Sequence, residues 1–263
     1  MLSGLIVYSK ADKDKNTWFI NRCIETLSSK GVSLSYLDED DVLYYLSKHQ
    51  IDFVIYRARN YSLLEEIEAK GIKCFNSAFT NKIANDKYLT YQLLTKESIP
   101  CVPSFRDIEE VNAYPLIMKS VDGHGGQEVF LLNAKEDVKA YQAPNKKYIY
   151  QEYYKINGDL RLYVLNKKVI GAVFRHNKND FRSNFSLGGE VEIFSPDAKL
   201  VETAEKVAQL LNADYIGVDF FQVNNKWLIN EIEDPVGAKM LYKTSHIDVI
   251  SLFTDFIYSY LIK

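Results

Sequence analysis

The stretch that decides the fold reads GVDFFQVNNKWLINEIE and covers residues 217–233. Two apolar runs within and around it, residues 215–223 and 227–233, are rich in aromatic and β-branched side chains and predict β-strands. The pair Asn224-Asn225 between them is typical of a tight turn, because asparagine tolerates the backbone angles that such turns require. The segment therefore predicts two adjacent antiparallel strands.

Three carboxylates mark this pair of strands: Asp219 on the first strand, and Glu231 and Glu233 on the second. Side chains alternate across a strand, so Glu231 and Glu233 share one face, and an antiparallel partner adds Asp219 to it. Acids gathered in this way repel one another unless a cation is present, and magnesium held by carboxylates and nucleotide phosphates meets that need. The alternative is a solvated strand with scattered acids, but the flanking residues are strongly apolar. We expect a metal site.

A second group of residues, KSVDGHGG at positions 119–126, places Lys119 at the end of an apolar strand just before a glycine loop. Glycines at 123, 125 and 126 let backbone N–H groups turn toward anionic oxygens, and a lysine fixed on a strand adds a point charge for the same phosphates. A hairpin turn with an exposed lysine explains the loop equally well when it is taken in isolation.

A third group, DFRSNFSLGG at positions 180–189, sets arginine, serine and asparagine before a glycine pair. Arg182 and Asn184 have side chains that suit phosphate or substrate, and a hydrogen-bonded surface turn is the alternative. Upstream, the run 159–161 (DLR) and Arg175 occupy strand positions where a charged side chain needs a partner or a ligand. No serine–histidine–aspartate arrangement or metal-type histidine spacing is found, so covalent catalysis is not indicated.

The composition narrows the class of protein. The chain has 263 residues, 47% hydrophobic and 25% charged, which is typical of a globular protein with a sizeable core. The chain has 32 basic and 35 acidic residues and no dense basic run, so its sequence does not predict the positively charged surface that binding to nucleic acid requires. The oligomeric state stays open, a homo-oligomer included.

The cysteines and the ends of the chain indicate where the protein works. Three separated cysteines predict neither a disulfide framework nor a zinc site. The apolar run 5–8 is too short for a secretion signal, and the apolar stretch 247–262 carries two aspartates and predicts a packed helix rather than a membrane span. We expect a cytoplasmic protein that does not enter a membrane.

The first 85 residues alternate apolar runs with amphipathic stretches. Expected strands cover residues 4–9, 32–37, 52–58 and 72–75. Helices are expected between them, one over residues 17–30 and another opened by a capping box at Ser62 to Glu65. This alternation predicts a small parallel sheet. No GxGxxG follows the first strand, so we expect a substrate-side or structural layer rather than a dinucleotide site.

Beyond residue 85 the pattern changes to a helix over residues 86–95 and then to strands separated by turns. Expected strands cover residues 114–120, 128–132, 148–154, 160–165 and 169–175, and a helix is expected over 200–211. Such spacing favours antiparallel sheets. The fold class is therefore α/β (α+β), with a domain boundary near residue 85.

Taken in order, the motifs resemble those of the RimK-like ATP-grasp ligases. They are Asn85-Asp86-Lys87, Ile99-Pro100, Lys119 with its loop, Gln151-Glu152-Tyr153, Asp159-Leu160-Arg161, Asp180 to Gly189, Gly217-Val218-Asp219 and Glu231-Ile232-Glu233. The resemblance implies an ATP-grasp fold with a Rossmann-like preATP-grasp domain at residues 1–85. Residues 86–263 would form the ATP-grasp domain, with a lid subdomain at about 100–155 and a metal-binding subdomain at about 156–263.

The resemblance also implies roles for individual residues. ATP would be bound by Lys87, Lys119, Gly123, Gly125, Gly126, Glu152, Tyr153, Asp159, Arg182 and Ser183. Two magnesium or manganese ions would be bound by Asp219, Glu231 and Glu233, and the reacting groups would be contacted by Arg175, Arg182 and Asn184. Two departures from the family pattern concern one loop: Glu233 stands where asparagine is usual, and Pro235 comes one place early.

The implied activity is ligation of a carboxylate to an amine or amino-acid acceptor, driven by ATP through an acyl phosphate. The added group could be an amino acid such as glutamate, and the acceptor a metabolite, a peptide or a protein. Glu233 leaves a second hypothesis open: an ATP-binding sensor or partner protein of the same fold without ligase activity.

Overall fold

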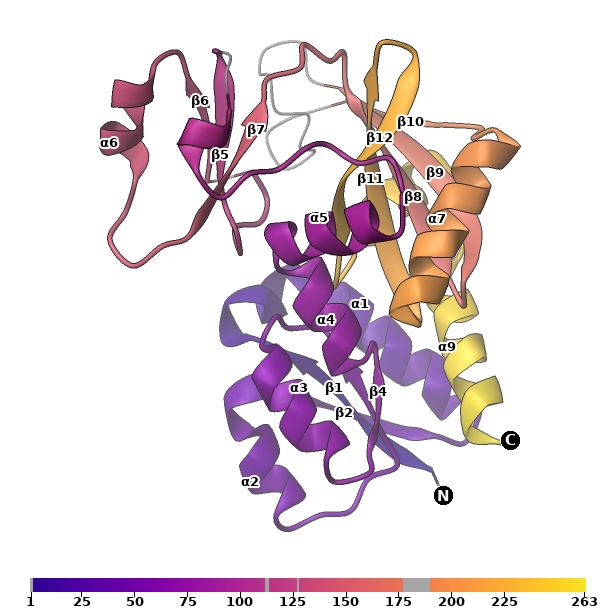
Figure 1. Ribbon diagram of the computed structural model, residues 1–263. Coiled ribbons are helices and arrows are strands. Elements are labelled where there is room, and N and C mark those ends of the chain that lie inside the picture. Colours follow the sequence, from indigo (N-terminus) through magenta and orange to yellow (C-terminus); the bar gives the residue numbers. More distant parts are fainter. Residues whose placement is uncertain (1, 112–113, 127, 177–189) are drawn as a thin grey trace.

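The computed structural model describes residues 2–111, 114–126, 128–176 and 190–263, which form three β-sheets with helices packed around them (Figure 1). The N-terminal sheet is parallel, with strand order β2-β1-β3-β4. Its strands are β1 (Ser3–Tyr8), β2 (Ser33–Asp38), β3 (Phe53–Tyr56) and β4 (Lys73–Phe75). The predicted small parallel sheet is therefore confirmed.

Side chains alternate between the two faces of this sheet and bury both of them. Ile6 packs with α1 (Lys10–Ser28) and the C-terminal helix α9 (Val249–Leu261). Val7, next along β1, faces the opposite way, toward α3 (Tyr61–Glu68) and Val42 of α2 (Val42–Leu46). Because α9 packs on the N-terminal sheet, the contacts of the C-terminal segment extend across the expected boundary at residue 85, and that division stays a prediction.

The start of α3 differs from the prediction. Asn60 takes the N-cap position, and its side chain accepts a hydrogen bond from the backbone N–H of Leu63. The helix begins at Tyr61, one residue before Ser62, so the predicted capping box opened by Ser62 is wrong. Asparagine satisfies a free N–H group as well as serine does at this position.

Two helices, α4 (Ala78–Ala84) and α5 (Lys87–Lys96), lead to a separate small sheet with strand order β6-β5-β7 (Figure 1). Its strands are β5 (Leu116–Ser120), β6 (Val129–Leu132) and β7 (Tyr148–Glu152), with the short helix α6 (Val138–Tyr141) at its edge. Asp86 caps α5 by accepting hydrogen bonds from the N–H groups of Tyr88 and Leu89, so the helix starts where the sequence predicts.

The third and largest sheet is antiparallel, with strand order β10-β9-β8-β11-β12. Its bounds are β8 (Asp159–Leu165), β9 (Lys168–His176), β10 (Glu190–Ile193), β11 (Tyr215–Val223) and β12 (Lys226–Glu233). One face, with Leu160, Leu162 and Val218, packs on α7 (Ala198–Leu211). The other face carries charged residues and lies near α8 (Lys239–Thr244).

Two tight turns lie in the described part of this sheet, and the one at Asn224-Asn225 was predicted. Asn166 and Lys167, and likewise Asn224 and Asn225, have positive φ angles, which suit a turn between two antiparallel strands. None of the helices among the described residues has the combination of length and apolar character that crossing a membrane requires.

Candidate active site

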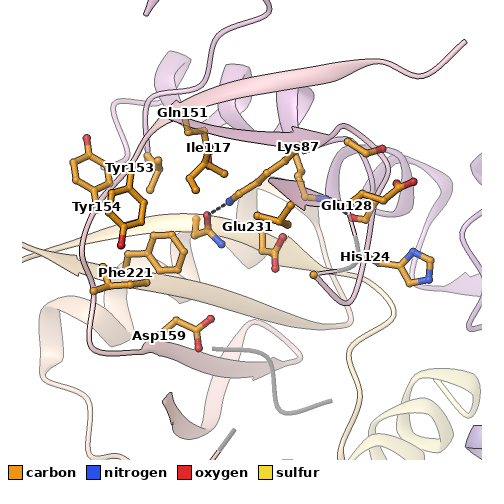
Figure 2. A pocket seen from close by; sticks show the side chains of 18 of the residues that line it. Lys87, Ile117, His124, Glu128, Gln151, Tyr153, Tyr154, Asp159, Phe221 and Glu231 are labelled. Carbon is orange, nitrogen blue, oxygen red and sulfur yellow. Dashed lines mark hydrogen bonds between the residues drawn. The ribbon is translucent and has the colours of Figure 1, made fainter. Parts of the chain in front are cut away.

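A cavity lies between the β6-β5-β7 sheet and the strands β11 and β12 of the large sheet; we call it the nucleotide-side cavity (Figure 2). Its walls come from α5, the strands β5, β6, β7, β8, β11 and β12, and the loops between them. The residues expected at a nucleotide site that line it are Lys87, Lys119, Gly123, Gly125, Gly126, Glu152, Tyr153, Asp159 and Glu231. Segments far apart in the sequence are thus brought to one cavity.

Two lysines occupy one wall of this cavity. Lys119, on β5, is buried, and its Nζ donates a hydrogen bond to Asn230 Oδ1 at 2.8 Å. Burial lowers the pKa of Lys119 to about 8, although the charge of Glu231 opposes that shift. Lys87 Nζ donates to the carbonyl of Gly123, which places the second lysine against the glycine loop. The wall is therefore cationic where the loop crosses it.

The glycine loop runs from the end of β5 to the start of β6. Gly125 and Gly126 have φ angles of 66° and 72°, in the left-handed region that other residues rarely adopt. A Cβ atom on Gly125 would meet nothing within 4 Å, so that position faces open space. A backbone of this kind can approach phosphate oxygens closely, because no side chain stands in the way.

The other end of the nucleotide-side cavity is apolar and aromatic. Val102, Ile117, Tyr153, Tyr154, Ile156 and Phe221 line it, and Figure 2 shows Tyr153 and Phe221 on the same side of the cavity. Flat aromatic groups prefer such surfaces because stacking adds to the burial of apolar area. The cavity therefore combines an apolar slot with a cationic, glycine-lined end, which suits a base and its phosphates.

The three carboxylates of the 217–233 segment lie together, as the sequence predicts. Asp219 pairs with Glu231 across β11 and β12, Gly217 pairs with Glu233, and oxygens of the three acids lie within 4.8 Å of one another. Burial raises the pKa of Glu231, and the charges of Glu233 and Asp219 raise it further, although Lys87 opposes them. A set of carboxylate oxygens fits a hard cation such as magnesium or manganese.

Two arginines hold the buried member of this cluster. Asp219 is 0% exposed and accepts hydrogen bonds from Arg161 Nε and Nη2, each at 2.6 Å, and from Arg175 Nη2 at 2.6 Å. Arg175 also binds Asp159 at 2.6 and 2.7 Å, and Arg161 lies 3.2 Å from Glu233. Burial alone would raise the pKa of Asp219, but the two guanidinium charges outweigh it and hold that pKa below its usual value.

On the other side of these arginines lies a second cavity, which we call the N-terminal-side cavity. It is lined by Arg161, Arg175 and Glu233, by Tyr8, Asp12, Lys15, Asn16, Trp18, Phe19, Arg57 and Arg59 from the N-terminal region, and by Pro235, Gly237, Ala238, Lys239 and Met240. His124 and Gly125 line both cavities. The two cavities therefore meet at the glycine loop, close to the carboxylates.

The loop that follows Glu233 is fixed by asparagines of the N-terminal region. Asp234 is buried, and its carboxylate accepts hydrogen bonds at 2.9 Å from both Asn76 and Asn81. Asn85 donates to the backbone carbonyl of Asp234 at 2.8 Å. Asp234 thus joins the end of β12, which carries Glu231 and Glu233, to α4, so the loop after Glu233 has a structural anchor of its own.

A family model described as the RimK-like ATP-grasp domain matches residues 84–257. The chain belongs to the RimK-like ATP-grasp family. Both the predicted family and the predicted ATP-grasp fold are therefore confirmed.

Named relatives of this RimK-like chain include ligases. An uncharacterised protein of Mycoplasma genitalium is 31% identical, over 90% of this chain and 86% of its own length. A probable alpha-L-glutamate ligase of Haemophilus influenzae is 30% identical, over 74% of this chain and 71% of its own. The solved structure of the ATP-grasp ligase PsnB, with a phosphomimetic variant of a minimal precursor, magnesium and ADP, has a TM-score of 0.72 at 16% identity over 99% of both chains.

Several residues of this RimK-like site were not singled out from the sequence. Asn230 receives the Lys119 hydrogen bond, and it is the extra residue at an irregularity where the pairing of β11 and β12 shifts between Asp219 and Phe220. Phe221 was assigned no role from the sequence. Arg57 is recognisable in the sequence only as a charged residue that follows an apolar strand. The expected residues Arg182, Ser183 and Asn184 lie outside the described residues, and their roles stay predictions.

Proposed function

We propose that the chain is an ADP-forming carboxylate–amine ligase, with ATP in the nucleotide-side cavity and two magnesium ions at Asp219, Glu231 and Glu233. The observation that carries the proposal is that the two lysines, the glycine loop and Glu231 line one cavity, and that Glu231 forms a cluster with Asp219 and Glu233. Lys119 and Lys87 would hold the phosphates, and Tyr153 and Phe221 would border the base. Bound magnesium would supply the positive charge that offsets the phosphates during transfer.

The reaction would take two steps. A substrate carboxylate oxygen attacks the γ-phosphorus, and the bond from the γ-phosphorus to the β,γ-bridging oxygen breaks. The products of this step are ADP and an acyl phosphate. The acceptor amine then attacks the carbonyl carbon, the bond to phosphate breaks, and the nitrogen loses a proton as the amide forms. The junction of the two cavities at His124 and Gly125 supports this order, because a phosphate end and a substrate end can meet there. A closed glycine loop would keep water from the acyl phosphate.

Glutamate, joined to a small molecule or a peptide, is the substrate that the relatives favour, since the Haemophilus influenzae relative is named a probable alpha-L-glutamate ligase. A nucleotide-binding protein without ligase activity is the second candidate. Glu233 favours it, because this carboxylate replaces the usual asparagine and is in contact with Arg161.

The test is ADP release with ATP, magnesium and a broad pool of amino acids, carboxylates and peptides. We expect turnover that falls by about a hundredfold or more in Glu231→Gln, because the metals stabilise charge in the transferring phosphoryl group. Wild-type protein that binds ATP but releases no ADP above background would favour the second candidate. Intact-mass analysis of the pool would reveal the joined product as a loss of one water.

A further inference from the structure

The N-terminal-side cavity opens at the carboxyl edge of the parallel sheet, where β1 and β3 lie side by side. The chain leaves β1 into α1 on one face, and it leaves β3 toward α3 on the opposite face. Loops that diverge in this way leave a crevice, and ligands of open α/β sheets bind in such crevices. Tyr8 ends β1 and Arg57 follows β3, so both stand at its floor.

Arg57 is the unusual group in this crevice. It is 4% exposed, its Nε donates to Tyr8 Oη at 3.2 Å, and its Nη2 donates to the Val236 carbonyl at 2.6 Å. Its guanidinium lies 4.7 Å from the Phe19 ring centroid. Among the residues that the structure describes, no carboxylate oxygen lies within 4.0 Å of this guanidinium. The charge of the buried Asp234 acts on Arg57 from beyond that distance, but its oxygens already accept hydrogen bonds from two asparagines. Only neutral acceptors and rings contact the guanidinium, so this buried cation has no acid in direct contact.

The other arginines of the same cavity differ from Arg57 in this respect. Arg59, two residues away, lies 3.2 Å from Asp12, and Arg161 and Arg175 bind Asp219. Each of them therefore has at least one acid in direct contact. Arg59 is thus a matched comparison for Arg57: it comes from the same loop and lines the same cavity, but its charge is already paired.

Two lysines add to the positive charge beside Arg57. Lys15 belongs to the face of α1 that borders the cavity, and Lys239 Nζ donates to the Lys15 carbonyl at 2.9 Å. Within the described part of the chain, neither lysine has a carboxylate at ion-pairing distance. An anionic group that enters the crevice would therefore meet one buried and two more accessible cations.

We propose that Arg57 binds an anionic group of the substrate, a carboxylate or a phosphate that is separate from the reacting group. This inference rests on the proposed function, because it takes the N-terminal-side cavity as the place of a ligase substrate. The reacting group lies at the His124 and Gly125 junction, and the anionic group lies toward Arg57. Arg57 is then a specificity-determining residue, supplied by the N-terminal sheet rather than by the metal-binding strands.

The experiment measures binding and turnover with matched pairs of probes. The probes are L-glutamate with L-glutamine, L-aspartate with L-asparagine, and O-phospho-L-serine with L-serine, each titrated calorimetrically in the presence of a non-hydrolysable ATP analogue and magnesium. We expect at least one acidic member to bind about tenfold more tightly than its neutral partner, since a charge-assisted hydrogen bond in a buried site is lost with the neutral one. The pairs separate a carboxylate from a phosphate.

Three variants complete the design. Arg57→Gln should reduce the ratio of acidic to neutral affinities to near one, Arg57→Lys should restore part of it, and Arg59→Gln should leave it within about threefold of wild type. An arginine that merely anchors the Val236 loop would lower the unfolding temperature in Arg57→Gln and leave the ratio intact.

The outcomes separate this inference from the proposed function. If no acidic probe binds more tightly than its partner, or if Arg57→Lys and Arg57→Gln keep the wild-type ratio, the inference is wrong. If the ratio of acidic to neutral affinities depends on Arg57 but the protein releases no ADP from ATP with any of the probes, the inference stands and the ligase proposal loses its support.

Discussion

The nucleotide-side and N-terminal-side cavities share His124 and Gly125 but are assembled differently. The first collects short motifs, such as the loop at residues 119–126 and the segment 217–233, in which most functional residues are neighbours in sequence. The second combines α1, the end of β3, the large sheet and the loop after β12, and it shows no local motif. The comparison indicates that the residues proposed to bind the nucleotide come from short local motifs, whereas those proposed to contact the substrate are brought together only by the packing of the layers.

The wall between the cavities is the place where the largest effect is expected. Asp219→Asn removes the carboxylate that the buried Arg161 and Arg175 share, so we expect the free energy of unfolding to fall by about 3–5 kcal/mol. Urea unfolding measures this change. The arrangement of side chains should change in both cavities, because the two arginines line the N-terminal-side cavity while Asp219 belongs to the carboxylate cluster.

Glu231→Gln is the matched control for that variant. Glu231 belongs to the same cluster, but it has no ion pair with a described residue, and burial already raises its pKa. A neutral amide there should change stability by less than about 1 kcal/mol, while metal-dependent turnover is lost. Equal stability of Asp219→Asn and wild type would show that the arginines do not depend on this acid.

The residues of this wall show how far the sequence can lead. Alternation and a tight turn are local properties, and they sufficed to predict the strands β11 and β12 and the grouping of Asp219 with Glu231 and Glu233. The run 159–161 and Arg175 were expected to need partners. Their identity could not be predicted, because it depends on the register that sets Arg161 opposite Asp219 between β8 and β11.

Arg57 shows where prediction from sequence ends. Nothing in the residues around it distinguishes it from Arg59, and the absence of a described acid in direct contact with it emerges only when α1 and the Val236 loop pack around it. The predicted N-cap of α3 was wrong for a simpler reason. Asn60 and Ser62 are both good N-cap residues, and which of them caps the helix depends on where the chain leaves β3.

The second largest effect is expected at the Asp234 anchor, which joins the two regions. Asn81→Ala removes one donor to the buried Asp234 carboxylate, so we expect a loss of about 1–3 kcal/mol in the free energy of unfolding. Because Glu233 is adjacent, manganese affinity measured by electron paramagnetic resonance should also weaken severalfold. Asn85→Ala, which alters only backbone-directed hydrogen bonds of a half-buried side chain, is the control and should cost about 1 kcal/mol or less.

An unchanged manganese affinity in Asn81→Ala would mean that the N-terminal layer does not position the carboxylate cluster. The carboxylate cluster would then be held in place without the Asp234 anchor.

The smallest of these effects is a pH dependence confined to the nucleotide-side cavity. Burial lowers the pKa of Lys119 to about 8, so in the free protein its positive charge is present below that pH and is lost as the pH rises through it. Nucleotide phosphates bind the charged form. The dissociation constant for ATP, measured at constant free magnesium, should therefore rise about tenfold from pH 7 to pH 9.

Lys119→Met is the control for this pH dependence. It should bind ATP more weakly at pH 7 and show little further weakening up to pH 9, because the titrating charge is gone. Acidic probes of the N-terminal-side cavity should keep their preference over the same range in wild type, since arginine stays charged. If the ATP affinity falls equally with pH in wild type and in Lys119→Met, the titrating group is not Lys119. If the preference for acidic probes is lost over the same pH range, one titrating group affects both cavities.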